Sequence, residues 1–237
     1  MQLLDLTLPS PVENLALDEA LLIAAEEGTG SEVLRFWELS TYAAVVGSGG
    51  SVAIDVNLAA CEADGVPVLR RSSGGGTVLL GPGCLCFSLV LHYERAQGLN
   101  EIPASNRYIL ARITKALTPV VASMREGTSD LAVNGVKFSG NAQQRKRTHF
   151  LHHGTLLCGF DLARVSKYLN PPERQPDYRR NRPHAEFIAN LPIGVDEAKR
   201  LLSAEWQPVG DYAPLPLMKM QELVAEKYAR DEWNRRR

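Results

Sequence analysis

The sequence lacks any long uninterrupted apolar run. Its longest apolar stretch, residues 15–25, is broken by Asp18 and Glu19. The amino terminus also lacks the basic start and the cleavage pattern of a signal peptide. These two absences exclude membrane proteins from the candidate classes and predict a cytoplasmic location.

Cysteine is scarce, and the spacing of the cysteines gives no sign of a redox pair or a metal site. None of the four cysteines forms a Cys-x-x-Cys pair or a metal-ligand pattern, so buried reduced thiols are expected. The four residues are Cys61, Cys84, Cys86 and Cys158.

The chain has no large excess of charge of either sign. It contains 26 basic and 27 acidic residues, and the formal net charge is -1. Such a balance gives no overall field that would favour nucleic acid or an acidic membrane surface as a partner. The hydrophobic fraction of 45% is that of an ordinary globular protein. A chain of 237 residues is long enough to bury a substantial core.

Two common nucleotide-binding signatures are also missing, the Gly-x-Gly-x-x-Gly that opens a helix and the Gly-x-x-x-x-Gly-Lys-Ser/Thr of the P-loop. The chain instead has RRSSGGGTVLLGPG at residues 70–83. Glycines expose backbone N–H groups, and the two arginines add fixed positive charge. The residues alone leave two interpretations open, an anion-binding site and a plain glycine-rich turn.

Local patterns predict an irregular alternation of strands and helices. Ser10, Pro11 and Glu13 form a capping box that begins a helix. Asn134-Gly135 lies between two alternating segments and predicts a hairpin. The further expected elements are strands at 33–37, 42–47, 66–69 and 84–93, helices at 56–65 and 106–121, a strand, a helix and a strand within 152–169, and a mobile loop at 171–183. This order favours an α+β fold with a mixed, largely antiparallel sheet packed with helices.

Two longer segments carry a family resemblance. They are LRRSSGGGTVLLGPGCLCFS at 69–88 and TSDLAVNGVKFSGNAQQRKRTHFLHHGTLL at 128–157. Together they resemble the lipoate-protein ligase A family, in the superfamily that includes biotin protein ligases and octanoyltransferases. The resemblance extends from NLALDEALL near the start to KYARDEWN near the end. It implies the α+β catalytic-domain fold of the biotin and lipoate ligases, formed by residues 1–237 as a single domain.

The resemblance also implies a reaction. Lipoate would attack the α-phosphate of ATP, with Mg²⁺ present, to give lipoyl-AMP, and a lysine of an acceptor protein would then take the lipoyl group. Both transition states gather negative charge, which fixed cations and backbone donors can stabilise. Lys137 is the expected catalytic residue and contacts both ATP and lipoate. Because Val136 and Phe138 share one face of a strand, the period of two sends Lys137 to the other face.

The remaining site residues follow from the same resemblance, and each could instead be structural. Arg71 is expected to bind phosphate as a planar fork. Asp130 is expected near Mg²⁺ and the phosphates, because a hard cation prefers carboxylate oxygen. Gly76, Thr77, Val78 and Leu79 are expected along the nucleotide. The lipoate-binding set is Leu15, Trp37, Ala44, Ser73, Gly75, Lys137 and His153.

The sequence departs from the family at Leu79, Leu80 and Gly81, where an aromatic residue, histidine and aspartate are usual. The GPG at 81–83 is similar to the octanoyltransferase branch, whose enzymes pass the acyl group through a cysteine without ATP. No cysteine stands at either expected nucleophile position, and Cys84 beside the loop is the one unorthodox candidate. An octanoyl or lipoyl transferase without ATP and a non-catalytic lipoate-binding module therefore remain as alternatives to the ligase.

Partners also follow from the resemblance. The acceptor would be a lipoyl domain, a glycine-cleavage carrier or another lipoate-binding protein. Since the sequence stops where the family's catalytic domain stops, we expect no C-terminal accessory domain. Either a separate accessory-domain protein or a self-sufficient short form is compatible with that expectation.

Overall fold

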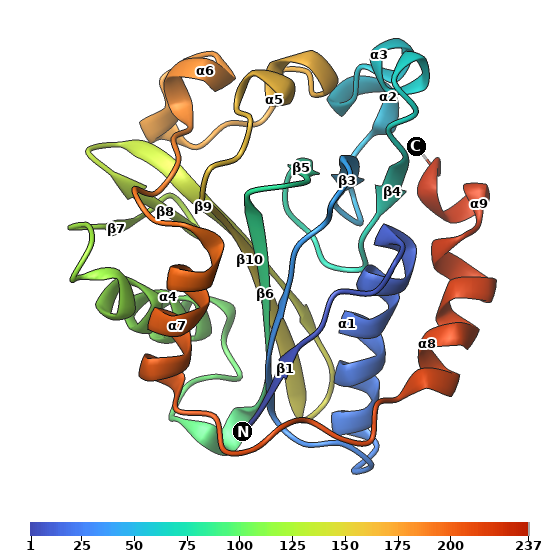
Figure 1. Cartoon of the computed structure of the whole chain (residues 1–237), viewed down its shortest axis with the longest axis vertical. Coiled ribbons are helices and arrows are strands. Elements are labelled where there is room, and N and C mark those ends of the chain that lie inside the picture. The colour runs from blue at the N-terminus through green and yellow to red at the C-terminus, as the bar shows by residue number, and fades with distance from the viewer. Residues whose placement is uncertain (237) are drawn as a thin grey trace.

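The computed structural model describes residues 1–236 and contains two β-sheets with helices around them (Figure 1). The strands are β1 (Gln2–Asp5), β2 (Val33–Trp37), β3 (Ala43–Val46), β4 (Val68–Arg70), β5 (Val78–Leu80), β6 (Cys84–His92), β7 (Met124–Glu126), β8 (Asp130–Val133), β9 (Val136–Arg145) and β10 (His149–Leu157). The α-helices are α1 (Pro11–Glu26), α2 (Val52–Asp55), α3 (Leu58–Ala63), α4 (Ile102–Leu117), α5 (Ala163–Tyr168), α6 (His184–Phe187), α7 (Val195–Trp206), α8 (Leu217–Leu223) and α9 (Asp231–Asn234). Short 3₁₀ turns at Tyr93–Arg95 and Asp177–Arg179 and a π-helical turn at Val224–Tyr228 complete the elements.

The large sheet has the strand order β1-β2-β6-β10-β9-β8-β7. Only β1 and β2 pair in parallel, and the other neighbours are antiparallel. The predicted α+β class with a mixed, largely antiparallel sheet is therefore confirmed.

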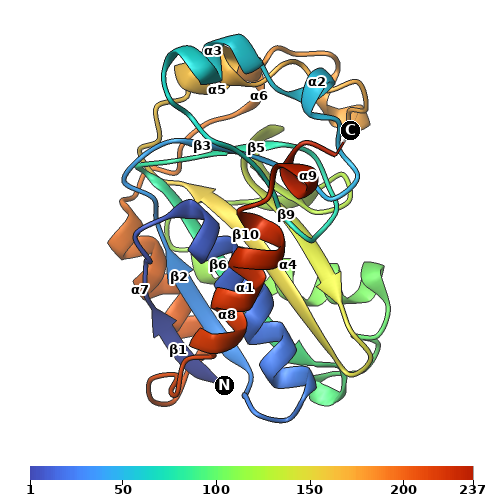
Figure 2. The same cartoon turned by 90° about the vertical axis from the view of Figure 1, so that its right-hand side faces the viewer.

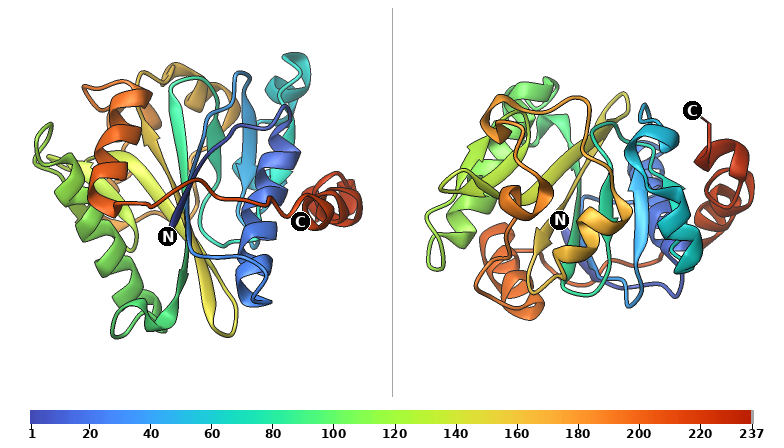
Figure 3. Two further views of the ribbon diagram at one scale, coloured as in Figure 1. Left: turned by 60° about the horizontal axis from the view of Figure 1, so that its bottom comes forward. Right: turned by 90° about the horizontal axis from the view of Figure 1, so that it is seen from above.

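Strand β6 shows how this sheet separates two cores. Leu85, Phe87 and Leu89 belong to the core shared with α4 and α7, whereas Cys86 and Val90 belong to the core shared with α1. This alternation is the period of two of a strand covered on both faces. Figure 1 shows α4 and α7 on one side of the sheet and α1 on the other. Helix α8 then packs on the outside of α1, as Figures 2 and 3 show.

Helix α1 begins as predicted. The Ser10 side chain accepts from the backbone N–H of Glu13, the Glu13 carboxylate accepts from the Ser10 backbone, and Pro11 takes the first helical position. These contacts satisfy N–H groups that a helix start otherwise leaves unpaired.

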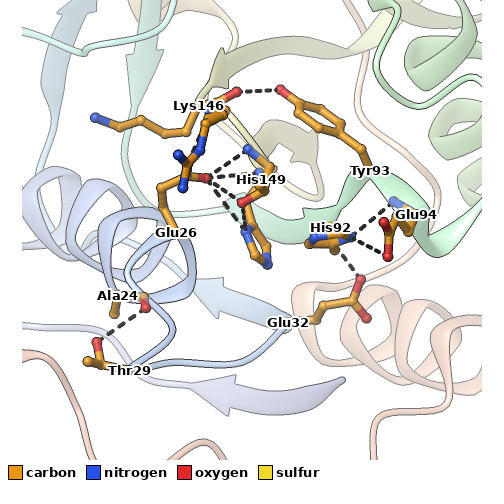
Figure 4. Close-up of polar contacts among 11 residues, drawn as sticks. Ala24, Glu26, Thr29, Glu32, His92, Tyr93, Glu94, Lys146 and His149 are labelled. Carbon is orange, nitrogen blue, oxygen red and sulfur yellow. Dashed lines mark hydrogen bonds and ion pairs between the residues drawn. The ribbon is translucent and has the colours of Figure 1, made fainter.

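The far end of α1 fixes the β9–β10 hairpin (Figure 4). The Glu26 carboxylate accepts from the backbone N–H groups of Arg147, Thr148 and His149 and from the Thr148 hydroxyl, at 2.8–3.2 Å. Desolvation alone would raise the pKa of Glu26, but the hydrogen bonds from Thr148 and its neighbours lower it to about 2. The carboxylate form of Glu26 therefore stabilises the folded hairpin.

The small sheet has the order β4-β3-β5, with β3 parallel to β4 and antiparallel to β5. Residues 71–77 of the glycine-rich stretch form the loop that connects β4 to β5. The small sheet thereby presents this loop to one end of the large sheet.

Two element predictions were wrong, and β1, α7 and α8 are among the elements that were not predicted. Strand β1 was not predicted, because QLLD is short and its partner lies far along the chain. Helix α4 begins at Ile102 and not at residue 106, with Pro103 in its first turn. Within residues 1–236, the strand expected after α5 does not form, and Leu169 makes only an isolated bridge to Val56.

Among the described residues, no helix has both the length and the apolar content that crossing a bilayer would need.

Candidate active site

A cavity of about 170 Å³ opens between α1, one face of the large sheet and the glycine-rich loop. Its walls come from eight parts of the chain, namely α1, β2, β3, β6, the start of β8, β9, β10 and the segment that runs from the loop into β5. Ten residues predicted for the site line it: Leu15, Trp37, Arg71, Gly75, Gly76, Thr77, Val78, Asp130, Lys137 and His153.

Ala44 and Leu79 were predicted for the site but face the core. They are direct partners in the antiparallel β3–β5 ladder, so their side chains share a face, and both are at most 5% exposed. Because side chains alternate along a strand, their neighbours Val45 and Leu80 line the cavity instead. On each of the two predicted strands, the side chain that lines the cavity thus lies one residue away from the predicted position, while the predicted backbone contact of Leu79 with the nucleotide stays a prediction.

Ser73 lies behind the cavity wall and is 1% exposed. Its Oγ accepts from Arg71 Nε at 3.0 Å and makes a second hydrogen bond, 2.6 Å long, with His153 Nε2. Ser73 therefore acts on the cavity through Arg71 and His153, both of which line it.

Lys137 lies on the β8–β9 hairpin, whose Asn134-Gly135 turn has positive φ at both residues, 52° and 73°. This geometry matches the predicted two-residue turn. Lys137 Nζ lies 2.8 Å from Asp130 Oδ1, and the lysine side chain is 26% exposed. The hairpin thus brings a cation and a carboxylate together at the cavity rim.

The second oxygen of Asp130 accepts a hydrogen bond from the Tyr178 hydroxyl at 2.7 Å. Burial and the Asp130 charge both raise the pKa of Tyr178, so the phenol stays a donor. Tyr178 lies in the segment predicted to be a mobile loop, and its neighbour Arg179 is buried. Part of that segment is therefore bonded to the site.

Arg71 is 7% exposed, and its guanidinium is largely occupied by the loop itself. Besides Ser73, it donates to the carbonyl oxygens of Val45 at 3.2 Å, Gly74 at 2.6 Å and Gly76 at 2.8 Å. Burial lowers the pKa of Arg71 to about 10, so it keeps its charge near neutral pH. The structure thus gives Arg71 a role in shaping the loop in addition to its predicted position at the cavity.

The loop backbone also approaches β3 closely. A Cβ on Gly47 would lie 2.0 Å from the Gly75 carbonyl oxygen, and Gly75 itself has φ +89°. Both positions therefore require glycine.

The sequence reasoning missed a buried polar network in the cavity wall, where Asp18 and Ser88 line the cavity with His153. Asp18 forms an ion pair with Arg35, accepts from the Ser88 hydroxyl at 2.7 Å and lies 3.6 Å from His153 Nδ1. Burial alone would raise the pKa of Asp18, but the Arg35 charge together with His153 and Ser88 holds it below its ordinary value. The signal for this network was present, since Asp18 interrupts the longest apolar run.

All four cysteines are buried, as predicted. Cys86 lines the cavity, but burial and its neighbour Cys84 raise the pKa of its thiol well above the ordinary value. Burial likewise raises the pKa of Cys158 to about 12. These thiols are poor candidates for a nucleophile, which must be a thiolate.

Within residues 1–236, no group of three or more His, Cys, Asp or Glu side chains is arranged to hold a metal ion. Of the two carboxylates that line the cavity, Asp18 is paired with the buried Arg35, so Asp130 is the candidate ligand for a metal ion. One carboxylate together with substrate phosphates is a common donor set for Mg²⁺. The residues present therefore fit an ion that arrives with a nucleotide, and not an ion held by the protein alone.

Comparisons with known proteins find a matching family and similar folds. Residues 10–204 match the family described as lipoyl protein ligase A/B catalytic domain. A Mycoplasma pneumoniae protein named "Probable lipoate-protein ligase A" is 34% identical over 160 residues, which are 68% of this chain and 46% of that relative. The chain thus spans about half the length of that relative.

Solved structures show the same fold. A bi-partite lipoate protein ligase from Thermoplasma acidophilum, described with its E2 lipoyl domain, superposes with a TM-score of 0.82 over 99% of this chain and 95% of its own, at 22% identity. A lipoate-protein ligase A bound with ATP gives a TM-score of 0.81 over 99% of this chain and 98% of its own, also at 22% identity.

Proposed function

The chain belongs to the lipoyl protein ligase A/B catalytic-domain family, and from this membership we propose that it is an ATP-dependent lipoate-protein ligase. It activates lipoate to lipoyl-AMP and transfers the lipoyl group to a specific lysine of an acceptor protein. The observation that carries the proposal is the Lys137 ammonium at the cavity rim, 2.8 Å from Asp130 and in a cavity also lined by the glycine-rich loop.

In the first step a lipoate carboxylate oxygen attacks the α-phosphate of ATP, and pyrophosphate leaves. The attacked phosphate gains negative charge in the transition state, which Lys137 is positioned to neutralise. Asp130 orients the ammonium through the ion pair. The backbone of Gly75, Gly76 and Thr77 lies along the same cavity and can donate N–H groups to phosphate oxygens. Mg²⁺, when bound with ATP at Asp130, supplies further charge neutralisation.

In the second step the acceptor lysine attacks the lipoyl carbonyl carbon as a neutral amine, and AMP leaves. The amide forms after the amine loses a proton to solvent. The carbonyl oxygen becomes negatively charged in this step as well, and the same ammonium can stabilise it.

The apolar part of the cavity suits the acyl chain. Leu15, Val45, Leu80 and Phe87 line it together with Trp37. The Trp37 indole N–H is buried and has no hydrogen-bond partner among residues 1–236, so a bound ligand could satisfy it. We therefore assign the lipoyl chain to this part and the nucleotide to the part beside Gly76, Thr77 and Val78.

Acyl transfer without ATP would need a reactive thiol. Burial raises the pKa of the Cys86 thiol, and Cys84 faces the core and is 1% exposed. The cavity therefore favours the ligase over the transferase. By analogy with the bi-partite Thermoplasma acidophilum ligase, we propose a lipoyl domain as the acceptor and a separate accessory protein as a second partner.

Mass spectrometry on protein incubated with lipoate, ATP and Mg²⁺ tests the proposal. A lipoyl-AMP mass that disappears when ATP is omitted is the expected result. If no adenylate forms with or without candidate accessory proteins, but an octanoyl-carrier donor acylates the protein, the transferase alternative replaces the ligase.

A further inference from the structure

Residues 217–236 lie beyond the part of the chain that matches the family and pack along α1 toward the glycine-rich loop (Figures 1 and 2). This segment, here called the C-terminal clamp, contains α8, the π-helical turn and α9. It contacts the residues on both sides of Arg71, the arginine that shapes the loop.

The first contact is made with Arg70, at the end of β4. The Arg70 backbone N–H donates to Asn234 Oδ1 at 2.9 Å, and Trp233 Nε1 donates to the Arg70 carbonyl oxygen at 2.8 Å. The buried Arg70 guanidinium also donates to the carbonyl oxygens of Trp233 and Asn234, at 3.0 and 3.2 Å. The clamp therefore pairs both backbone polar groups at the entrance to the loop.

The second contact is a ring of hydrogen bonds that includes Ser72. Tyr228 Oη donates to Glu19 Oε2 at 2.7 Å and lies 3.1 Å from Ser72 Oγ. Ser72 donates to Gln144 Oε1, and Gln144 Nε2 donates to Glu19 Oε1 at 2.8 Å. Lys227 Nζ, 2.7 Å from Glu19 Oε2, neutralises the carboxylate. The ring joins the loop to α1 and to β9, and both of these elements line the cavity.

Arg70 and Ser72 flank Arg71, whose guanidinium binds the carbonyl groups of Gly74 and Gly76. Because Arg70 and Ser72 are held in place, the backbone of Arg71 between them is held as well, and with it the side chain that shapes the loop. We propose that the C-terminal clamp holds the glycine-rich loop in its nucleotide-accepting conformation, with Tyr228 and Trp233 as positioning residues. The expectation that the clamp assists ATP binding rests on the proposed ligase function.

Hydrogen–deuterium exchange of the full-length protein, read at residues 70–77, tests the clamp without any ligand. Tyr228→Phe removes only the Tyr228 hydroxyl from the ring of hydrogen bonds. Tyr168→Phe is the matched control, because its buried hydroxyl also donates to a carboxylate, that of Asp64, at 2.6 Å and Tyr168 does not line the cavity. We expect exchange of the loop amides to accelerate about tenfold in Tyr228→Phe, which corresponds to about 1.4 kcal/mol, and to stay unchanged in the control.

Steady-state adenylation supplies the second measurement. Tyr228→Phe should raise KM for ATP several-fold while kcat and KM for lipoate change less. Trp233→Phe, which keeps an aromatic ring but deletes the indole N–H that donates to Arg70, should act in the same direction. Unchanged loop exchange in both variants would overturn the clamp. If the wild-type protein forms no adenylate but the exchange result stands, the ligase proposal fails and the clamp survives.

Discussion

Replacing Lys137 with methionine is the sharpest test of the site. Methionine keeps an unbranched side chain that is one atom shorter and removes the positive charge 2.8 Å from Asp130. A group aimed at developing charge contributes roughly 3–4 kcal/mol, or about 10²–10³ in rate, when it is deleted. We therefore expect adenylate formation to fall by at least about 10²-fold.

The same change also affects stability. It leaves the Asp130 carboxylate, whose side chain is 15% exposed, with Tyr178 as its remaining donor. Losing one partner of a partly buried ion pair should cost about 1–3 kcal/mol of unfolding free energy. Urea unfolding measures this loss, and rates are compared at a temperature where the variant is fully folded.

Two further variants separate charge from shape. Lys137→Arg keeps the charge but replaces the compact ammonium with a planar guanidinium, which places its donors at different points beside Asp130. We expect it to recover stability and not the rate. Lys146→Met, at the exposed turn of the β9–β10 hairpin, is the control and should leave both quantities unchanged. A folded Lys137→Met protein that retains a rate within tenfold of wild type would refute the assignment of Lys137.

Three other expectations follow from the structure. Asp18→Asn leaves the fully buried Arg35 guanidinium without its carboxylate and should lower the unfolding free energy by about 3 kcal/mol in urea titrations, whereas the exposed Asp161→Asn should change it little. The folded-state pKa of Glu26 is about 2, below the ordinary value of 4.5, so its stabilisation is fully present above about pH 4.5 and is lost as pH falls toward 2. Glu26→Gln should accordingly be about 2 kcal/mol less stable than wild type near neutral pH and approach it at low pH, and a pH-independent difference in chemical denaturation would contradict this. Finally, a free lysine is neutral in only about one molecule in a few thousand at pH 7. Transfer to the acceptor should therefore accelerate from pH 7 to 9, while adenylation does not. Matching pH profiles of the two half-reactions would disprove the neutral-amine step.

Local signals were sufficient for much of the fold. The Ser10 capping box and the Asn134-Gly135 turn are decided by a few neighbouring residues, and both form as predicted. Strand β1 could not be found in this way, because its residues pair with β2 about thirty positions away. The strand order of the sheet depends on such distant pairing and is not encoded in any short window.

The site was predicted to the level of its strands and less well to the level of its side chains. No local sequence feature distinguishes Ala44 and Leu79 from Val45 and Leu80, since all four are apolar residues on buried strands. The face that each presents is set by the register between β3 and β5. Asp18 did carry a mark, as a charge within an apolar run, but its partner Arg35 is known only from the packing of α1 on β2.

Three cations lie in or beside the cavity, and their partners explain why Lys137 is the one expected to meet the reacting atoms. Arg35 is fully buried against Asp18. Arg71 uses four of its five N–H groups, one on Ser73 and three on loop and β3 carbonyl oxygens. The Lys137 ammonium has three protons and, among residues 1–236, pairs with the Asp130 carboxylate alone. Two of its donors therefore remain for phosphate or carbonyl oxygen. A cation that is held by one carboxylate and still has free donors can stabilise negative charge in both steps, on the phosphate in the first and on the acyl carbonyl oxygen in the second.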